Sequence, residues 1–247
     1  MHVAPTERPA RKSRRSGYIP PQRMNTDTLQ NLLNRFGRGA GNDRQLDLLR
    51  SYGAKDVFVH YSGDIRFLAS KVVSIVGTRE ISEEGIKRAN RLSRELASFG
   101  VVVMSGLAKG VDSVAHSAAI GVGGKTAAVI GTPLDRAYPA ENADLQTEIY
   151  THHLLLSPFG LGEEVYRSNF PARNRVMALL SDATVIVEAS DTSGTLHQAA
   201  ECQRSGRWLF IMKSVAEDSR LSWPKKFLNH EKTRVLGASE DILEALR

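Results

Sequence analysis

The stretch KVVSIVGTREISEEGIKRANRLSRELASFGVVVMSG (71–106) decides the fold. It opens with VVSIVG (72–77), a continuous apolar run that ends in glycine and is typical of a strand buried on both faces. Apolar residues at helical spacing then predict a helix over 82–98, with glutamates in its first turn. A second apolar run follows at 101–106. Strand, helix and strand joined by short connections predict two parallel strands of one sheet.

The same alternation of apolar runs and helical patterns continues toward the C-terminus. It predicts an α/β fold in which a parallel sheet is covered by helices on both faces. After residue 212 the pattern weakens until one final helix. The further expected helices are 111–120, 143–150, 174–180, 195–204 and 239–247, and the further expected strands are 125–131, 154–156, 183–189 and 208–212.

The region before this alternation has a different composition. Residues 1–23 hold six Arg or Lys, four Pro and few apolar side chains, which predicts a disordered basic tail. Such a tail either binds phosphates electrostatically or is simply solvated, and the sequence leaves both interpretations open. Two short helices are expected at 26–36 and 43–52, followed by a short strand and turn from Asp56. The predicted division is a tail (1–23), a short helical appendage (24–56) and the main domain (57–247).

The net charge of +6 is concentrated at one end of the chain. Residues 1–23 carry six cations against Glu7, so they contribute +5 and leave +1 for the remainder. A basic binding surface on the main domain must therefore come from local clustering. The single cysteine, Cys202, excludes an internal disulfide and favours a reducing compartment such as the cytoplasm. No apolar run is long enough for a membrane helix, so no membrane partner is expected.

Four loops follow strands at what should be one edge of the sheet. Because ligands of parallel sheets collect beyond the carboxyl ends of the strands, these loops are expected to meet around one site. All are rich in Gly, Ser and Thr, which let the backbone approach an anion closely and add hydroxyl donors. Together they predict phosphate binding. The loops are GTRE (77–80), SGLAKG (105–110), GTPLDRAYP (131–139) and EASDTSGT (188–195).

Several cations accompany these loops. Arg79 directly follows the first strand, and Lys109 lies between the second strand and its helix. Arg173 and Arg175 flank the expected start of a helix, where positive charge opposes the helix dipole unless an anion binds. This local conflict indicates a functional site. The alternative is that Arg173 or Arg175 pairs with Glu188 or Asp112 and serves the structure alone.

No catalytic or metal-binding arrangement is recognisable in the sequence. Asp112 and His116 share a helical face but lack a third ligand, and Asp112 is also interpreted as a helix cap. Neither a GxSxG nor a GxxxxGK[ST] motif is present. Cys202 is interpreted as a structural thiol, Tyr138 with Pro139 as a turn, and Phe170 as either a core residue or a base-stacking one. We therefore expect no catalytic residue, no metal and no cofactor.

Six motifs in this order resemble the DprA/Smf family of DNA-processing proteins: IVGTR, SGLAKGVDSVAH, GGKTAAVIG, YPAEN, FPARNR and VIVEASDTSGTL. The resemblance covers residues 57–212 and extends more weakly to 247. It implies an extended Rossmann-like fold, non-catalytic binding of single-stranded DNA, homodimerisation, and loading of the recombinase RecA onto DNA during transformation. The DNA-phosphate residues that it implies are Gly77, Arg79, Ser105, Gly106, Lys109, Arg173, Asn174, Arg175, Ser193, Gly194 and Thr195.

The sequence also departs from that family's pattern. Gln198 stands where a threonine is usual, Pro158 replaces an acidic residue, and Met212 begins a stretch that lacks the usual Pro-Gly. A C-terminal winged-helix domain is not expected. A related role in phage defence or plasmid biology is therefore an alternative to transformation.

Two alternatives from other classes use the same loops. Phosphoribohydrolases of the LOG type cleave nucleoside monophosphates and carry a glutamate three residues after the threonine of PGGxGTxxE. Here that position is Gln198, and an amide cannot supply the carboxylate that such chemistry needs. A nucleotide-binding sensor that signals to a partner protein is the other alternative.

Overall fold

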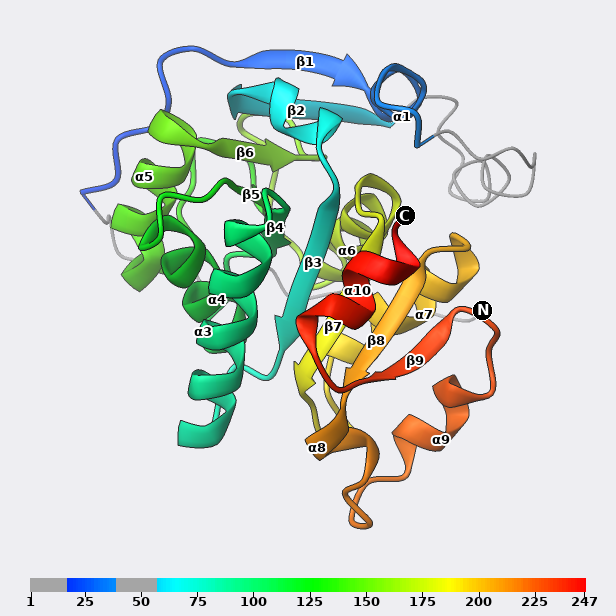
Figure 1. Ribbon diagram of the computed structural model, residues 1–247. Coiled ribbons are helices and arrows are strands. Elements are labelled where there is room, and N and C mark those ends of the chain that lie inside the picture. Colours follow the sequence, from blue (N-terminus) through cyan, green and yellow to red (C-terminus); the bar gives the residue numbers. More distant parts are fainter. Residues whose placement is uncertain (1–16, 39–56) are drawn as a thin grey trace, which may run out of the picture.

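A computed structural model describes residues 17–38 and 57–247 (Figure 1). In these residues the strands form one nine-stranded sheet in the order β1-β2-β6-β5-β4-β3-β7-β8-β9. The strands from β6 to β9 pair in parallel, which confirms the predicted parallel α/β sheet, while β1 and β2 are antiparallel additions at one edge. Their bounds are β1 (Asn25–Thr28), β2 (Phe58–Gly63), β3 (Val72–Gly77), β4 (Val102–Ser105), β5 (Thr126–Val129), β6 (Leu154–Ser157), β7 (Ala183–Glu188), β8 (Trp208–Met212) and β9 (Thr233–Leu236).

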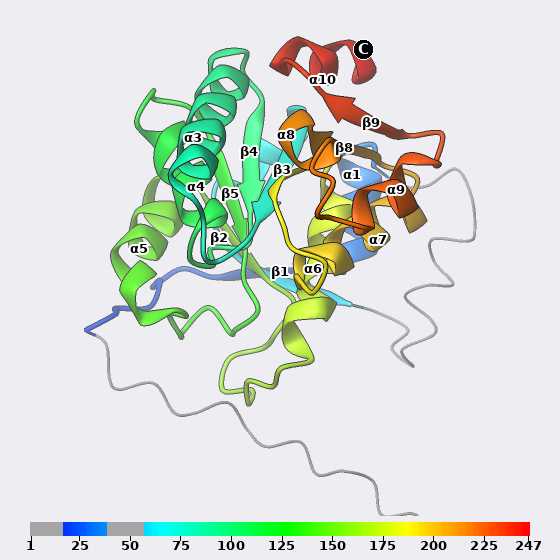
Figure 2. The same ribbon diagram turned by 90° about the horizontal axis from the view of Figure 1, so that it is seen from below.

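Helices cover both faces of this sheet, as predicted (Figure 2). Side chains alternate along a strand, so β3 sends Val73 and Ile75 to one face and Val72 and Val76 to the other. The first face packs against α3, α4 and α10, and the second against α1, α6, α7 and α9. The helices are α1 (Leu29–Arg35), α3 (Glu83–Ser98), α4 (Val111–Ile120), α5 (Ala143–His152), α6 (Asn169–Leu180), α7 (Thr195–Arg204), α8 (Lys213–Ala216), α9 (Trp223–Leu228) and α10 (Ser239–Ala245), with 3₁₀ turns η1 (Ile65–Ala69) and η2 (Ala140–Asn142).

Several elements differ from the sequence-based expectation, and β1, α8 and α9 are among those not predicted. Helix α6 begins at Asn169, not at residue 174, because Pro171 lies in its first turn, where a missing N–H costs nothing. The helix expected at 26–36 begins at Leu29, where Thr28 caps it by accepting a hydrogen bond from the backbone of Asn31. Strand β9 was not predicted. The helix expected at 43–52 lies outside the described residues.

Part of the N-terminal segment is hydrogen-bonded to the main domain. Tyr18, in the segment predicted as disordered, donates to the carbonyl of Leu134 and accepts from Gln146. Tyr150 of α5 donates to the carbonyl of Ile19. The expectation of disorder is therefore wrong for residues 17–23, because two tyrosines and a buried glutamine give this segment partners. The proposed boundaries at 23 and 57 stay predictions, although β1 is a strand of the same sheet as the main domain.

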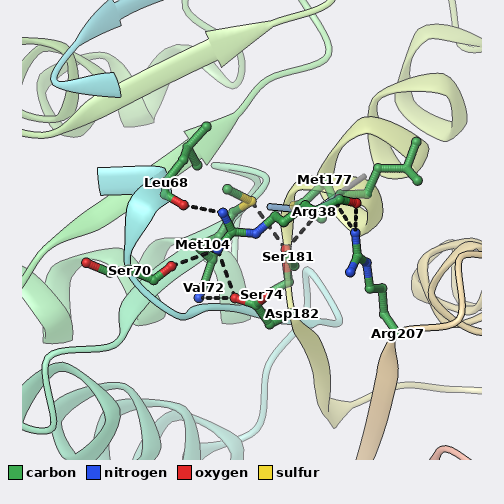
Figure 3. Close-up of polar contacts among 11 residues, drawn as sticks. Arg38, Leu68, Ser70, Val72, Ser74, Met104, Met177, Ser181, Asp182 and Arg207 are labelled. Atoms are coloured by element: carbon green, nitrogen blue, oxygen red, sulfur yellow. Dashed lines mark hydrogen bonds and ion pairs between the residues drawn. The ribbon is translucent and has the colours of Figure 1, made fainter. Parts of the chain in front are cut away.

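A buried polar cluster lies at the amino ends of β3 and β7 (Figure 3). The Arg38 side chain is 4% exposed and donates to the carbonyls of Leu68 and Ser70 (2.7 Å) and to Asp182 (2.9 Å). The Asp182 carboxylate also accepts from the backbone N–H of Val72 (2.7 Å). Arg207 donates to the carbonyl of Arg38 (2.7 Å). These contacts fasten the segment after α1 to the starts of β3 and β7.

Replacing Arg38 with methionine is expected to lower the free energy of unfolding by about 2 kcal/mol, because it leaves two carbonyls without their donor while keeping most of the apolar volume. Urea unfolding followed by circular dichroism would measure this. Arg35→Met is the matched control, since Arg35 is an exposed arginine of α1. Equal stability of the Arg38 and Arg35 variants would contradict the role of the cluster.

Candidate functional site

A pocket of about 480 Å³ opens at the carboxyl ends of β3 and β7. The loop after β3, the first half of α6 and the loop between β7 and α7 form its walls. Loops from separate parts of the chain thus meet at one edge, as the sequence analysis expected. The predicted residues that line it are Gly77, Arg79, Arg173, Asn174, Ser193, Gly194 and Thr195.

The two loops that follow β3 and β7 are tied to each other. The backbone N–H of Thr78 donates to the carbonyl of Glu188 (2.8 Å), and the Thr195 hydroxyl donates to the carbonyl of Gly77 (3.0 Å). A Cβ at Gly77 would overlap the side chain of Val111, so this close approach requires glycine. Helix α7 starts at Thr195, with Gly194 at its N-cap position beside the pocket. A helix N-terminus and exposed hydroxyls suit a bound anion.

The loop after β4 uses its polar groups internally. The Asp112 carboxylate accepts from the backbone N–H groups of Gly106 (3.1 Å) and Ala108 (3.3 Å). The Ser105 hydroxyl is fully buried and donates to the carbonyl of Ile75 (2.6 Å). The predicted phosphate contacts of Ser105 and of the Gly106 N–H therefore have no support in this geometry. Lys109 is half exposed and pairs with Glu141 (2.6 Å).

Arg173 lies deeper than a surface cation. Its side chain is buried and donates to the carbonyls of Gly106 (2.6 Å) and Val129, so that it joins α6 to the ends of β4 and β5. A Cβ at Gly106 would overlap the guanidinium. Burial lowers the pKa of Arg173 to about 10 and raises the pKa of Asp112, while attraction between the two opposes both shifts. Arg173 thus has a structural role, through backbone carbonyls and not through an ion pair with Asp112 or Glu188.

Arg175 lies away from the pocket. It stands two residues after Arg173, on a different side of α6, and pairs with Glu201 of α7 (3.2 Å), which also pairs with Arg204 (2.6 Å). Because α6 begins at Asn169, Arg173 and Arg175 stand inside the helix and not at its first residue. The predicted conflict with the helix dipole is therefore weaker than the sequence suggested. Glu188 pairs instead with Arg88 (3.6 Å).

An aromatic and cationic cluster lies beside the pocket. The Arg79 guanidinium is 5.9 Å from the centre of the Phe170 ring, and the rings of Phe170 and Tyr138 are 5.5 Å apart. Tyr138 is 41% exposed and Phe170 is half-buried. These three residues, with Lys109 and Arg173, also line a smaller cavity of about 50 Å³. Sequence reasoning assigned Tyr138 only to a turn, and its exposed ring next to the FPARNR segment is the signal that was missed.

The remaining candidates fall outside the site. The described residues contain no group of three or more His, Cys, Asp or Glu that could hold a metal ion. His116 is buried, bonds through its ring to Thr126 (2.7 Å), and has its pKa lowered by burial to about 3. Cys202 is buried and its pKa is raised by burial to about 12, which agrees with a structural thiol. In the described part of the chain no helix is long and apolar enough to cross a membrane.

A parallel sheet whose glycine-rich loops, helix N-terminus and arginine meet at one pocket defines a Rossmann-like α/β protein with a pocket suited to an anion. Comparison with known proteins narrows the class. The family model of DNA recombination-mediator protein A matches residues 45–247, and the chain belongs to this DprA/Smf family. Gly106, Lys109, Arg173 and Arg175 lie within the matched region.

Curated relatives carry the same family names. The DNA processing protein DprA of Streptococcus pneumoniae is 38% identical over 197 residues, which are 80% of this chain and 69% of that protein. Protein Smf of Synechocystis is 41% identical, over 57% of this chain and 35% of that protein. DprA of Bacillus subtilis is 32% identical, over 74% of this chain and 62% of that protein. The chain thus spans one third to two thirds of the length of these relatives.

Solved structures share the fold. DprA from Streptococcus pneumoniae superposes with a TM-score of 0.69 at 37% identity, over 76% of this chain and 65% of that chain. DNA processing protein A from Helicobacter pylori, whose structure is described with its single-stranded DNA binding mode, superposes with a TM-score of 0.70 at 26% identity. The superposition covers 90% of this chain and 95% of that chain. The expected extended Rossmann-like fold is confirmed.

Proposed function

We propose that the pocket binds the backbone of single-stranded DNA without sequence preference, and that the chain acts in DNA processing as a recombination mediator. The observation that carries this proposal is the pocket itself: the loops Gly77–Glu80 and Ser190–Thr195 and Arg79 form a phosphate site directly beside the exposed Tyr138 and half-buried Phe170 rings. Non-specific sites for single strands combine cations along the backbone with aromatic faces for the bases. Membership of the DprA/Smf family and the DNA-binding relative from Helicobacter pylori support it.

The residues that contact DNA under this proposal are a subset of those expected from the sequence. Arg79, Asn174, Ser193, Gly194 and Thr195 border the open part of the pocket. Gly77 permits the close approach of backbone, and Lys109 borders the smaller cavity. Gly106 and Arg173 hold these loops in place. Ser105 and Arg175 are not among the proposed DNA contacts, because Ser105 bonds inside the sheet and Arg175 pairs with Glu201.

Binding without catalysis is part of the proposal. Gln198 is 1% exposed and donates to the Thr184 hydroxyl (3.3 Å), so an amide occupies the position where the hydrolase alternative needs a carboxylate. A nucleotide sensor is the second candidate, because a pocket of about 480 Å³ falls in the size range of small-molecule sites. Homodimerisation and a RecA partner are proposals that rest on the family alone, and action in the cytoplasm is a proposal that rests also on the single cysteine.

Fluorescence anisotropy with labelled oligo-dT tests the proposal. We expect binding at low salt that weakens steeply as salt rises, with weaker binding to a duplex and to an abasic strand, because both hide or lack bases for Tyr138 and Phe170. Absence of oligo-dT binding at low salt would contradict the DNA function. Release of free base from a nucleoside monophosphate would support the hydrolase, and tight binding of a mononucleotide that displaces oligo-dT would support the sensor.

A further inference from the structure

The segment between β8 and β9 forms a basic extension of the pocket rim. Residues 213–232 hold five Lys or Arg against three Asp or Glu, whereas the main domain as a whole is nearly neutral. This segment contains α8 and α9, which lie at the edge of the sheet toward which β3 points (Figure 1). Figure 2 shows α9 on the same side of the sheet as α7, whose N-terminus borders the pocket. A local excess of positive charge therefore lies on the same edge as the phosphate site.

Hydrogen bonds attach α9 to the pocket rim. The carboxylate of Asp191 accepts from the backbone N–H (3.0 Å) and hydroxyl (2.9 Å) of Ser222 and from the backbone N–H of Trp223 (2.9 Å). The Trp223 indole, 1% exposed, donates to the carbonyl of Ala189 (3.1 Å). Asp191 stands between Ser190 and Ser193, which both line the pocket. Hydrogen bonds to Asp191 thus fix the start of α9 against the loop between β7 and α7.

Two lysines of this segment have neither an ion pair nor a side-chain hydrogen bond among the described residues. Lys213 pairs with Glu217 (3.8 Å) and Arg220 with Asp218 (2.7 Å), while Lys232 donates to a backbone carbonyl. The two that remain are Lys225 and Lys226, which are exposed in the last turn of α9.

Lys226 lies within electrostatic reach of the rim. Hydrogen bonds from Ser222 lower the pKa of Asp191, and the charge of Lys226 adds to this shift. Cations at a helix C-terminus favour the helix dipole, which is the purely structural reason for these two lysines. The hydrogen bonds between Asp191 and the start of α9 also hold these two lysines near the pocket rim. There the charge of Lys226 offsets the repulsion between the Asp191 carboxylate and an incoming phosphate.

We propose that Lys225 and Lys226 form an extension of the DNA site, over which a single strand that leaves the pocket across the 190–193 loop continues along α9. This inference rests on the proposed function and adds to it the path of the strand. Short strands fill the pocket alone, and longer ones also place phosphates against α9. The extension therefore contributes affinity only above a certain strand length.

The test compares dT5 with dT20 in anisotropy titrations of the full chain. For the double variant K225A/K226A we expect binding of dT20 to weaken about 5- to 10-fold and its salt slope to fall by about 1.4, since each single-strand phosphate contact contributes about 0.7. Binding of dT5 should change less than about 2-fold, because it does not reach α9. The matched control K71A/K125A removes two exposed lysines from the opposite edge of the sheet, and both lengths should bind as before.

The outcomes separate this inference from the proposed function. If the wild-type chain binds neither oligonucleotide, the DNA function itself is wrong. If the wild type binds both and K225A/K226A loses nothing on dT20, or loses the same factor on both lengths, the extension along α9 is wrong while the DNA function stands. A selective loss on dT20 with unchanged circular dichroism and an unaffected control supports the extension.

Discussion

Replacing Arg173 with methionine is expected to lower the free energy of unfolding by about 3–5 kcal/mol, the range for leaving a buried charge uncompensated. The substitution keeps an apolar stem but removes the donors to the carbonyls of Gly106 and Val129. It also leaves the buried Asp112 without the positive charge that opposes its desolvation. Urea unfolding at pH 7 measures the loss, and oligo-dT binding should fall as well because the loops of the site lose their common anchor.

The pH dependence of this loss has a definite sign. Burial holds the pKa of Asp112 above its ordinary value of 3.8, and removal of Arg173 raises the pKa further. A carboxyl with a raised pKa favours the folded state in its protonated form, so its contribution is present below pH 3.8 and is lost as pH rises through the folded-state pKa. The destabilisation by Arg173→Met is therefore expected to be larger at pH 7 than at pH 4.

A double variant checks that the electrostatic interaction between Arg173 and Asp112 is the cause. Asp112→Asn removes the carboxylate yet keeps an oxygen for the backbone N–H groups of Gly106 and Ala108. In this background Arg173→Met should cost less than in the wild type, and the pH dependence should disappear. Strict additivity of the two substitutions, with a cost that does not vary between pH 4 and pH 7, would contradict an electrostatic interaction between Arg173 and Asp112.

Much of the fold is readable from local signals. Helices α4 and α7 and strand β8 have the predicted bounds, because each combines a clear period or apolar run with a boundary made by glycine or polar residues. Strand β9 was missed because its four residues TRVL bury only their ends and so show no apolar run. The start of α6 was missed because Pro171 was interpreted as a loop residue, although proline is tolerated in a first helical turn.

The site is predictable in place but not in detail. Parallel strands bring their carboxyl ends to one edge, so the convergence of the loops after β3 and β7 followed from their order in the chain. Which side chains face the opening depends on long-range packing that spacing does not encode. Arg173 reaches across to the ends of β4 and β5, and Ser105 turns into the sheet. Tyr138 becomes a candidate only because its loop meets Phe170 of α6.

For binding, the largest effect is expected from Arg79→Ala. Arg79 is an exposed arginine of the pocket that lies over the face of Phe170 and, among the described residues, forms no ion pair with a carboxylate. Its charge is therefore available to a phosphate. Hydrogen bonds to charged groups contribute about 1.5–3 kcal/mol, which corresponds to an affinity loss of about 10- to 100-fold for oligo-dT. Loss of one phosphate contact should also reduce the salt slope by about 0.7.

Two control variants make the Arg79 result specific. Arg79→Lys keeps the charge but loses the planar group over Phe170, so its affinity should lie between those of the wild type and Arg79→Ala. Arg66→Ala removes an arginine that is 82% exposed and paired with Asp64 away from the pocket, and should bind as the wild type does. The stability of Arg79→Ala should stay within about 0.5 kcal/mol of the wild type, since the side chain is exposed. If Arg79→Ala binds oligo-dT as tightly as Arg66→Ala with the same salt slope, the phosphates do not bind at this pocket, and the basic residues elsewhere in the chain must carry the DNA.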